Sequence, residues 1–307
     1  MGVLDRLLSS PDPFLSDGGM ETDLIFHEGA DLPLFASFVL LDSAEGREML
    51  RRYVVSYLDM AQATGRGFVL GTPTWRANGG WGPKLGLDDA GIRDVNRRAV
   101  AFARDLRDAH PWREQILIEG AMGPAGDGYA PAQLLTPTEA ARLHNAQLET
   151  FAQEGVDIAT AFTITHPGEA IGMVNRARDL GLPFALSFTV ETDGRLPTGQ
   201  DLASVLDEVE TATGGYCRYY GINCAHPEHF ADQLPSGWLH RIGMIRPNAS
   251  RRSHAELDEA TELDDGDPDE FGALYAEMAK RLPELRVIGG CCGSDMRHIK
   301  AVMAAGV

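Results

Sequence analysis

The sequence predicts a single α/β domain of the (β/α)8 barrel class over residues 1–307. Short apolar runs alternate with helical patterns along the whole chain, and eight such strand-then-helix units fit into its 307 residues. Barrels of this class have about 250 residues before insertions. A doubly wound open sheet is the alternative. It is disfavoured because no Gly-rich dinucleotide-binding turn follows any expected strand.

The expected strands are short runs rich in branched and aromatic residues, each ended by a turn. They lie near Phe14–Asp17, Phe68–Thr72, Ile116–Gly120, Ile158–Thr163, Phe184–Val190, Tyr219–Asn223, Ile242–Arg246 and Arg286–Gly289. Helical patterns fill the gaps between them and follow the last strand. Ala44–Gln62 and Asp89–Ala109 show this most clearly, because their apolar residues recur at three- and four-residue spacing. Ser294 is the expected N-cap of the final helix, with Asp295 in its first turn.

One polar segment, residues 250–269, interrupts this alternation. It is strongly acidic and ends in Asp264-Asp265-Gly266-Asp267-Pro268-Asp269. We expect a solvated insertion after the seventh strand. Calcium binding is disfavoured, because the fixed alternation of a calcium loop is absent.

Composition narrows the possible partners and the compartment. The net charge of -18 argues against binding to nucleic acid or to anionic membrane surfaces. No apolar stretch approaches the roughly 18 residues of a membrane span, and Met1–Pro13 lacks the pattern of a secretory signal. Four cysteines in so long a chain do not form a disulfide framework. The sequence therefore predicts a cytoplasmic protein in a reducing compartment with small-molecule partners.

Three of the four cysteines follow expected strands. Cys224 ends the sixth strand, and Cys291 and Cys292 follow the eighth. The adjacent pair is a poor disulfide, because neighbouring Cα atoms lie about 3.8 Å apart and a relaxed disulfide spans about 4.4–6.8 Å. Since strand ends carry the functional groups of such barrels, three thiolates there describe an open Zn²⁺ site with one vacant position. Cys217 precedes the sixth strand and is expected to be a small buried hydrophobe.

The motifs at these strand ends resemble the homocysteine S-methyltransferase family. They run along nearly the whole chain as Asp17-Gly18-Gly19-Met20, Leu186-Ser187-Phe188-Thr189-Val190, Gly221-Ile222-Asn223-Cys224, Pro247-Asn248-Ala249 and Gly290-Cys291-Cys292-Gly293. The resemblance implies that Cys224, Cys291 and Cys292 bind zinc, on which a substrate thiol is ionised. The thiol then takes a methyl group from a sulfonium or quaternary ammonium donor. Homocysteine, giving methionine, is the default acceptor.

The resemblance also points to residues around the substrates. The expected substrate contacts are Asp17, Gly18, Gly19, Phe162, Thr163, Asn223 and Arg246. Of these, Asp17 is a candidate for the substrate's amino group and Asn223 for a group that supports the metal ligands. Trp75, Trp81 and Tyr129 lie near strand ends, where aromatic faces could meet a cationic donor. Ordinary packing is the alternative for each ring.

The sequence departs from the family pattern at Phe162, at Arg246 and in the second-strand segment, where Thr72-Pro73-Thr74 replaces Thr-Asn-Thr. Phe162 stands where the family usually has a glutamate that meets the substrate's amino group, and Arg246 replaces a tyrosine. A buried guanidinium needs an anionic partner. We hypothesise that Arg246 meets a substrate carboxylate and that the acceptor is not held through an α-amino group. The alternative is that Arg246 pairs with an acidic residue of the 250–269 segment.

Two other functions fit a three-cysteine zinc site. In a zinc hydrolase, water would occupy the open position. Three thiolates make zinc a weak Lewis acid, however, and no Glu or His beside the cysteines is an obvious base. The second is a non-catalytic barrel that is stabilised by zinc or senses redox state.

Overall fold

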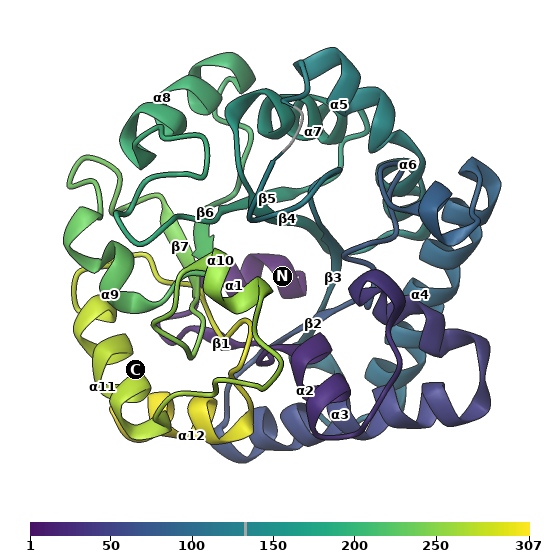
Figure 1. Ribbon diagram of the computed structural model, residues 1–307. Helices are drawn as coiled ribbons and strands as arrows, with labels where there is room; N and C mark the ends of the chain where they lie inside the picture. Colours follow the sequence, from purple (N-terminus) through teal and green to yellow (C-terminus); the bar gives the residue numbers. More distant parts are fainter. Residues whose placement is uncertain (132–133) are drawn as a thin grey trace.

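The computed structural model describes residues 1–131 and 134–307, in which eight strands form one closed barrel (Figure 1). The strands are β1 Phe14–Leu15, β2 Phe68–Gly71, β3 Ile116–Met122, β4 Ile158–Ile164, β5 Phe184–Phe188, β6 Tyr220–Asn223, β7 Ile242–Arg246 and β8 Val287–Ile288. Each pairs in parallel with the next, and β1 pairs with β8 to close the ring. The predicted (β/α)8 barrel is confirmed.

Most of the helices surround this ring on the outside, while α1 and α10 lie across its two ends (Figure 1). The helices are α1 Val3–Ser9, α2 Met20–Phe26, α3 Ala44–Thr64, α4 Asp89–Ala109, α5 Pro137–Leu143, α6 Asn145–Glu154, α7 Pro167–Asp179, α8 Leu202–Thr213, α9 Pro227–Phe230, α10 His254–Asp258, α11 Pro268–Ala279 and α12 Met296–Ala304. Within the described ranges, no helix is both long enough and apolar enough to cross a membrane.

The first helix closes the N-terminal end of the barrel. Leu7 of α1 packs with the inward-facing Phe14, Val69 and Leu117, and α1 lies at the centre of the ring in Figure 1. Arg6 also donates a hydrogen bond to the carbonyl of Glu114, just before β3. The opposite end, where the strands run into their following loops, is left for a functional site.

Capping residues set the ends of the two long helices. The Ser43 side chain accepts a hydrogen bond from the Gly46 amide at 2.9 Å, so α3 begins at Ala44 as predicted. It ends at Thr64, two residues later than expected, because Gly65 adopts a left-handed conformation with φ 70°. The predicted bounds of α4, Asp89–Ala109, are confirmed.

The first and last strands are shorter than predicted. The β1 ladder ends at Leu15 and the β8 ladder at Ile288, because the two loops that follow these strands diverge from each other. Single hydrogen bonds still join these loops, including one from the Gly290 amide to the Asp17 carbonyl at 2.9 Å.

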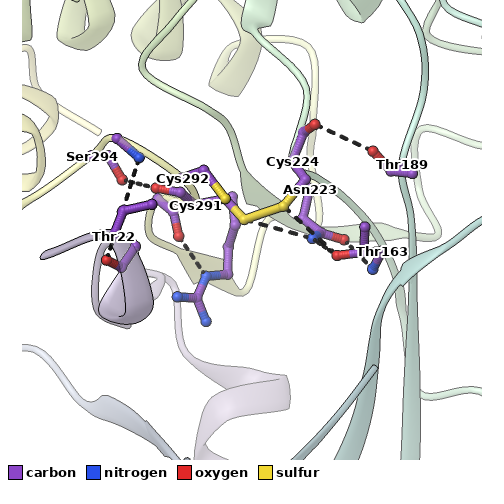
Figure 2. The surroundings of a disulfide bond; sticks show 12 residues. Thr22, Thr163, Thr189, Asn223, Cys224, Cys291, Cys292 and Ser294 are labelled. Atoms are coloured by element: carbon purple, nitrogen blue, oxygen red, sulfur yellow. Dashed lines mark hydrogen bonds between the residues drawn. A yellow bond between two sulfur atoms is a disulfide. The ribbon is translucent and has the colours of Figure 1, made fainter. Parts of the chain in front are cut away.

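The expected N-cap of the last helix was wrong by one residue. Asp295, rather than Ser294, caps α12, and its carboxylate accepts from the Arg297 amide at 2.8 Å. The Ser294 hydroxyl instead donates to the Cys291 carbonyl at 2.7 Å (Figure 2). It thereby fixes the loop that carries two cysteines.

The acidic segment between β7 and α11 contains the short helix α10, which crosses the open end of the barrel in Figure 1. Most of its side chains are exposed, as expected of a solvated segment. Its first helical residue, His254, is buried and contacts the backbone of Cys224. The segment is therefore anchored to the strand ends.

Candidate metal centre

Three cysteine sulfur atoms meet at the C-terminal end of the barrel. Cys224 directly follows β6, and Cys291 and Cys292 follow β8. Their Sγ atoms all lie within 4.8 Å of one another (Figure 2). Cys217 lies elsewhere in the apolar core, where burial raises the pKa of its thiol to about 12. The predicted convergence of three cysteines, without the fourth, is confirmed.

Two of these cysteines are joined in the structure. Cys224 and Cys291 form a disulfide with a Cα–Cα distance of 5.4 Å, and Cys292 is free. The adjacent pair is not bonded, as predicted, but three reduced thiols were expected. Cys224 and Cys291 can bond when oxidised, because their Cα separation falls within the roughly 4.4–6.8 Å that a relaxed disulfide spans. Reduction must precede metal binding by all three, since the thiolate is the ligand.

Each sulfur atom has a polar neighbour. These contacts are Thr163 Oγ1 to Cys224 Sγ at 3.7 Å, Asn223 Nδ2 to Cys291 Sγ at 3.9 Å, and Tyr129 Oη to Cys292 Sγ at 3.6 Å. Hydrogen-bond donors around a thiolate orient it and stabilise its charge. Three soft sulfur ligands with such support fit a zinc ion.

Asn223 and Thr163 hold each other in place. The Thr163 amide donates to Asn223 Oδ1 at 2.9 Å, and Asn223 Nδ2 donates to the Thr163 hydroxyl at 2.8 Å (Figure 2). Thr163 has φ 61° and Cys224 has φ 55°, values that non-glycine residues rarely adopt. Such strain persists where the surroundings fix the backbone, commonly at functional sites.

Two loops approach each other closely beneath the cysteines. A Cβ atom on Gly18 would lie 2.5 Å from the Ser294 carbonyl oxygen, and one on Gly19 would lie 2.5 Å from that of Cys291. Only glycine therefore fits at both positions. Gly18 and Gly19 were predicted as substrate contacts. They line a pocket next to the cysteines. They also allow the loop after β1 to pack on the loop that carries Cys291 and Cys292, which are called the β1 loop and the cysteine loop below.

His254 supports the Cys224 backbone from the acidic segment. Its Nε2 lies 2.6 Å from the Cys224 carbonyl oxygen, to which it donates, and its Nδ1 lies 2.9 Å from Glu191 Oε1. The imidazole also stacks on Tyr129, with ring centroids 4.0 Å apart. Through these contacts α10 reaches the surroundings of Cys224 and Cys292.

We expect His254→Ala to weaken zinc binding by about 10- to 100-fold, the usual effect of removing a group that orients a metal ligand. Competition with a chelator measures the affinity. His229→Ala is the matched control, because His229 contacts the exposed Arg251 backbone at 3.0 Å rather than a cysteine. Equal affinities of the two variants would contradict a supporting role for His254.

The predicted site residues surround one pocket of about 110 Å³ next to the cysteines. Its lining includes Asp17, Gly18, Gly19, Phe162, Thr163, Asn223, Cys224, Arg246, Cys291 and Cys292. All residues expected to contact substrate or metal are therefore brought together.

Arg246 has a protein partner. Its Nη2 lies 2.5 Å from Asp17 Oδ1 and its Nε donates to the Gly290 carbonyl at 2.9 Å. The other Asp17 oxygen accepts from the Tyr53 hydroxyl at 3.3 Å. The alternative that Arg246 pairs within the 250–269 segment was wrong. Pairing with Asp17 also removes the physical reason for expecting a substrate carboxylate at Arg246.

The three aromatic residues expected near a cationic donor, Trp75, Trp81 and Tyr129, have different partners in the structure. The Arg76 guanidinium lies between Trp75 and Trp81, 4.0 and 3.7 Å from the ring centroids. A cation of the protein itself therefore occupies the indole faces considered for the donor, although Trp75 also lines the pocket. Tyr129 is the aromatic residue that contacts a cysteine.

Two pocket carboxyl groups, Glu119 and Glu21, were not foreseen from the sequence. Glu119 on β3 is 1% exposed and accepts a hydrogen bond from the Thr160 hydroxyl at 2.5 Å. Burial raises its pKa to about 7. Burial also raises the pKa of Glu21, which accepts from the Ser37 hydroxyl at 2.8 Å. A charged residue within an otherwise apolar strand was the available signal for Glu119.

We expect Glu119→Gln to stabilise the ligand-free protein increasingly as the pH rises from about 4.5 to about 7. The unfolded carboxyl group ionises near its ordinary pKa of 4.5, whereas the folded one keeps its proton up to about 7. Ionisation therefore disfavours the folded state across this window. The gain should reach about 3 kcal/mol at pH 8. Thermal unfolding at several pH values measures it, and a gain independent of pH would contradict the expectation.

A family model described as homocysteine S-methyltransferase matches residues 14–305. Methionine synthase of Mycobacterium tuberculosis (strain ATCC 25618 / H37Rv) is 27% identical over 235 residues, which cover 70% of this chain and 18% of that protein. S-methylmethionine–homocysteine S-methyltransferase BHMT2 of Mus musculus is 26% identical over 188 residues, 54% of this chain and 48% of that protein. The matches thus span less than half the length of each relative.

Solved structures show the same fold. The homocysteine methyltransferase MmuM from Escherichia coli in its metallated form gives a TM-score of 0.76 at 23% identity, with 99% of each chain covered. Its oxidised form gives 0.75 at 24% identity, with the same coverage. The family model extends across all eight strands and all three clustered cysteines. This chain belongs to the homocysteine S-methyltransferase family.

Proposed function

We propose that the protein is a zinc-dependent thiol S-methyltransferase, with homocysteine as the default acceptor. The observation that carries this proposal is the group of three cysteine sulfur atoms within 4.8 Å of one another, in a member of this family. Reduced Cys224, Cys291 and Cys292 would hold the ion. When bound, zinc ionises a thiol that coordinates it. A reducing, cytoplasmic environment suits this function, because all three ligands must be thiolates.

The other residues of the site position these groups. Asn223 and Thr163 fix two of the sulfur atoms, and Tyr129 contacts the third. The Asp17–Arg246 pair holds the β1 loop against the cysteine loop. The acceptor's thiol would thus meet sulfur ligands whose orientation is set before it arrives, which reduces the entropic cost of reaction.

The charge of the pocket favours a cationic methyl donor. Its described lining carries three carboxyl groups, from Asp17, Glu21 and Glu119, and one guanidinium, from Arg246. Above about pH 7, where Glu119 is ionised, a sulfonium or quaternary ammonium donor is attracted by this excess of acid. The acceptor sulfur forms the new S–CH3 bond, and the electrons of the broken bond stay on the leaving sulfur or nitrogen atom. The leaving group is thereby neutralised and needs no proton.

The proposal is tested by incubating reduced, zinc-loaded protein with homocysteine and, in turn, S-methylmethionine, S-adenosylmethionine or betaine. Mass spectrometry should show a methylated thiol with at least one donor. Cys291→Ser should abolish the product, whereas Cys217→Ser should not. Stoichiometric zinc with intact thiols, but no alkylated product from homocysteine or another carboxylate-bearing thiol, would contradict it.

The Cys224–Cys291 disulfide favours a second candidate, a non-catalytic barrel that releases zinc on oxidation. The same experiment separates the two functions. A redox-sensing barrel would bind zinc when its thiols are reduced and release it when they are oxidised. It would methylate none of the acceptors.

A further inference from the structure

Glu119 is a carboxylate inside the barrel, on the strand next to Phe162. Along β3, the inward-facing Leu117 packs in the barrel interior, and Glu119 follows it two residues nearer the C-terminal end. Thr160 of β4, which donates to Glu119 Oε1, lies two residues before Phe162. The carboxylate therefore lies on the strand next to Phe162 and deeper in the barrel, since Glu119 pairs in register with Ile158.

One oxygen of this carboxylate has no partner in the described part of the chain. Glu119 Oε2 is buried and accepts no hydrogen bond, and Glu119 forms no ion pair there. The nearest guanidinium that lines the pocket, Arg246, is bonded to Asp17, Gly18 and Gly290. Ionising this carboxyl group with one buried oxygen unsatisfied is costly, and burial accordingly keeps its pKa at about 7 in the ligand-free protein. Glu119 Oε2 therefore lacks a hydrogen-bond donor, and a positively charged donor would suit it best.

The pocket has room for that donor beside Oε2. Gly71 of β2 is the register partner of Glu119, and both residues line the pocket. A Cβ atom on Gly71 would lie 3.6 Å from Oε2 and 4.0 Å from the Ala121 Cβ. The space that glycine leaves is thus open to the carboxylate oxygen and large enough for a small group.

We infer that Glu119 binds the ammonium group of the acceptor, so that the acceptor is a thiol carrying a primary amine. This inference rests on the proposed function. A primary ammonium supplies both the charge and the N–H donor that Oε2 lacks, whereas sulfonium and quaternary ammonium groups have no N–H. Glu119 on β3 thus takes the place of the glutamate that the family usually has at the position of Phe162 on β4. This assignment opposes the sequence-based hypothesis that the α-amino group is not held.

The test measures binding by calorimetry to reduced, zinc-loaded protein. The two ligands are homocysteine and 4-sulfanylbutanoate, which has the same thiol and carboxylate but no amine. Glu119→Gln keeps an oxygen acceptor for Thr160 and loses the charge. It should weaken homocysteine binding about 10- to 100-fold and change 4-sulfanylbutanoate binding less than about threefold. Gly71→Ala fills the space beside Oε2 and should also act mainly on homocysteine, which provides a test if Glu119→Gln does not fold.

Glu169→Gln is the matched control. Glu169 is a buried glutamate bonded to His144 at 2.8 Å and does not line the pocket, so its substitution should leave the preference for homocysteine over 4-sulfanylbutanoate unchanged. The inference is overturned if unaltered protein binds both thiols alike, or if Glu119→Gln weakens both equally. Methyl transfer is measured separately. Amine discrimination through Glu119 without any transfer would refute the proposed function alone, and transfer without Glu119-dependent discrimination would refute this inference alone.

Discussion

Replacing Cys291 by serine is expected to lower the zinc content of the reduced protein from about one ion per chain to nearly none. Serine has a similar size, but its hydroxyl does not ionise at neutral pH and is a poor ligand for zinc. The remaining Cys224 and Cys292 do not complete the three-sulfur set. Elemental analysis after gel filtration in a reducing buffer measures the content. Cys224→Ser and Cys292→Ser should behave in the same way.

Cys217→Ser is the control for this loss. Cys217 is buried in the apolar core and is not among the clustered sulfur atoms, so its variant should keep about one zinc per chain. Full zinc occupancy in Cys291→Ser would contradict the assignment of the site. Loss of zinc in Cys217→Ser with an intact fold would do the same.

Asp17→Ala is expected to lower the free energy of unfolding by about 3–5 kcal/mol, because it leaves the guanidinium of Arg246 buried without its anion. The side chains of both partners are 13% exposed, so water does little to replace the lost contact. Urea unfolding at neutral pH measures the change. The double variant Asp17→Asn with Arg246→Met removes both charges and should recover part of the stability.

An exposed ion pair provides the comparison. Glu28 and Arg52 lie 2.9 Å apart with side chains 44% and 52% exposed. Glu28→Ala should change stability by less than about 1 kcal/mol, as for most surface pairs. If Asp17→Ala is no more destabilising than Glu28→Ala, the Asp17–Arg246 pair does not hold the two loops together.

Periodicity predicted the barrel because each element carries its own local signal. The apolar spacing of Asp89–Ala109 defines α4 completely. The ends of β1 and β8 were harder to predict from the sequence, because they depend on where two loops diverge after Leu15 and Ile288. That divergence is a tertiary property, set by the contact of Gly18 and Gly19 with the cysteine loop.

The metal ligands were predictable because cysteines at strand ends can be recognised in the sequence from their residue type and position. The partner of Arg246 was not, since Asp17 lies 229 residues away and their contact depends on barrel closure. Glu119 was missed for a related reason. Whether a residue of β3 faces the pocket or the surrounding helices depends on strand register, which the sequence alone leaves open.

The acidic segment shows how composition can conceal a single anchored residue. Residues 250–269 are polar enough to predict a solvated segment, and most of their side chains are exposed. His254 is nevertheless buried between Tyr129 and the Cys224 carbonyl. No local pattern distinguishes this histidine from one facing solvent, because its partners Tyr129, Glu191 and Cys224 come from three other strand-end loops.

X-ray absorption at the zinc edge tests the central claim most directly, because it counts the sulfur atoms around the metal. Reduced, zinc-loaded protein should show three sulfur ligands and one lighter ligand. Addition of homocysteine should change this to four sulfur ligands, while homoserine, which has a hydroxyl in place of the thiol, should cause no change. A site with three sulfur ligands that homocysteine leaves unaltered would contradict the account.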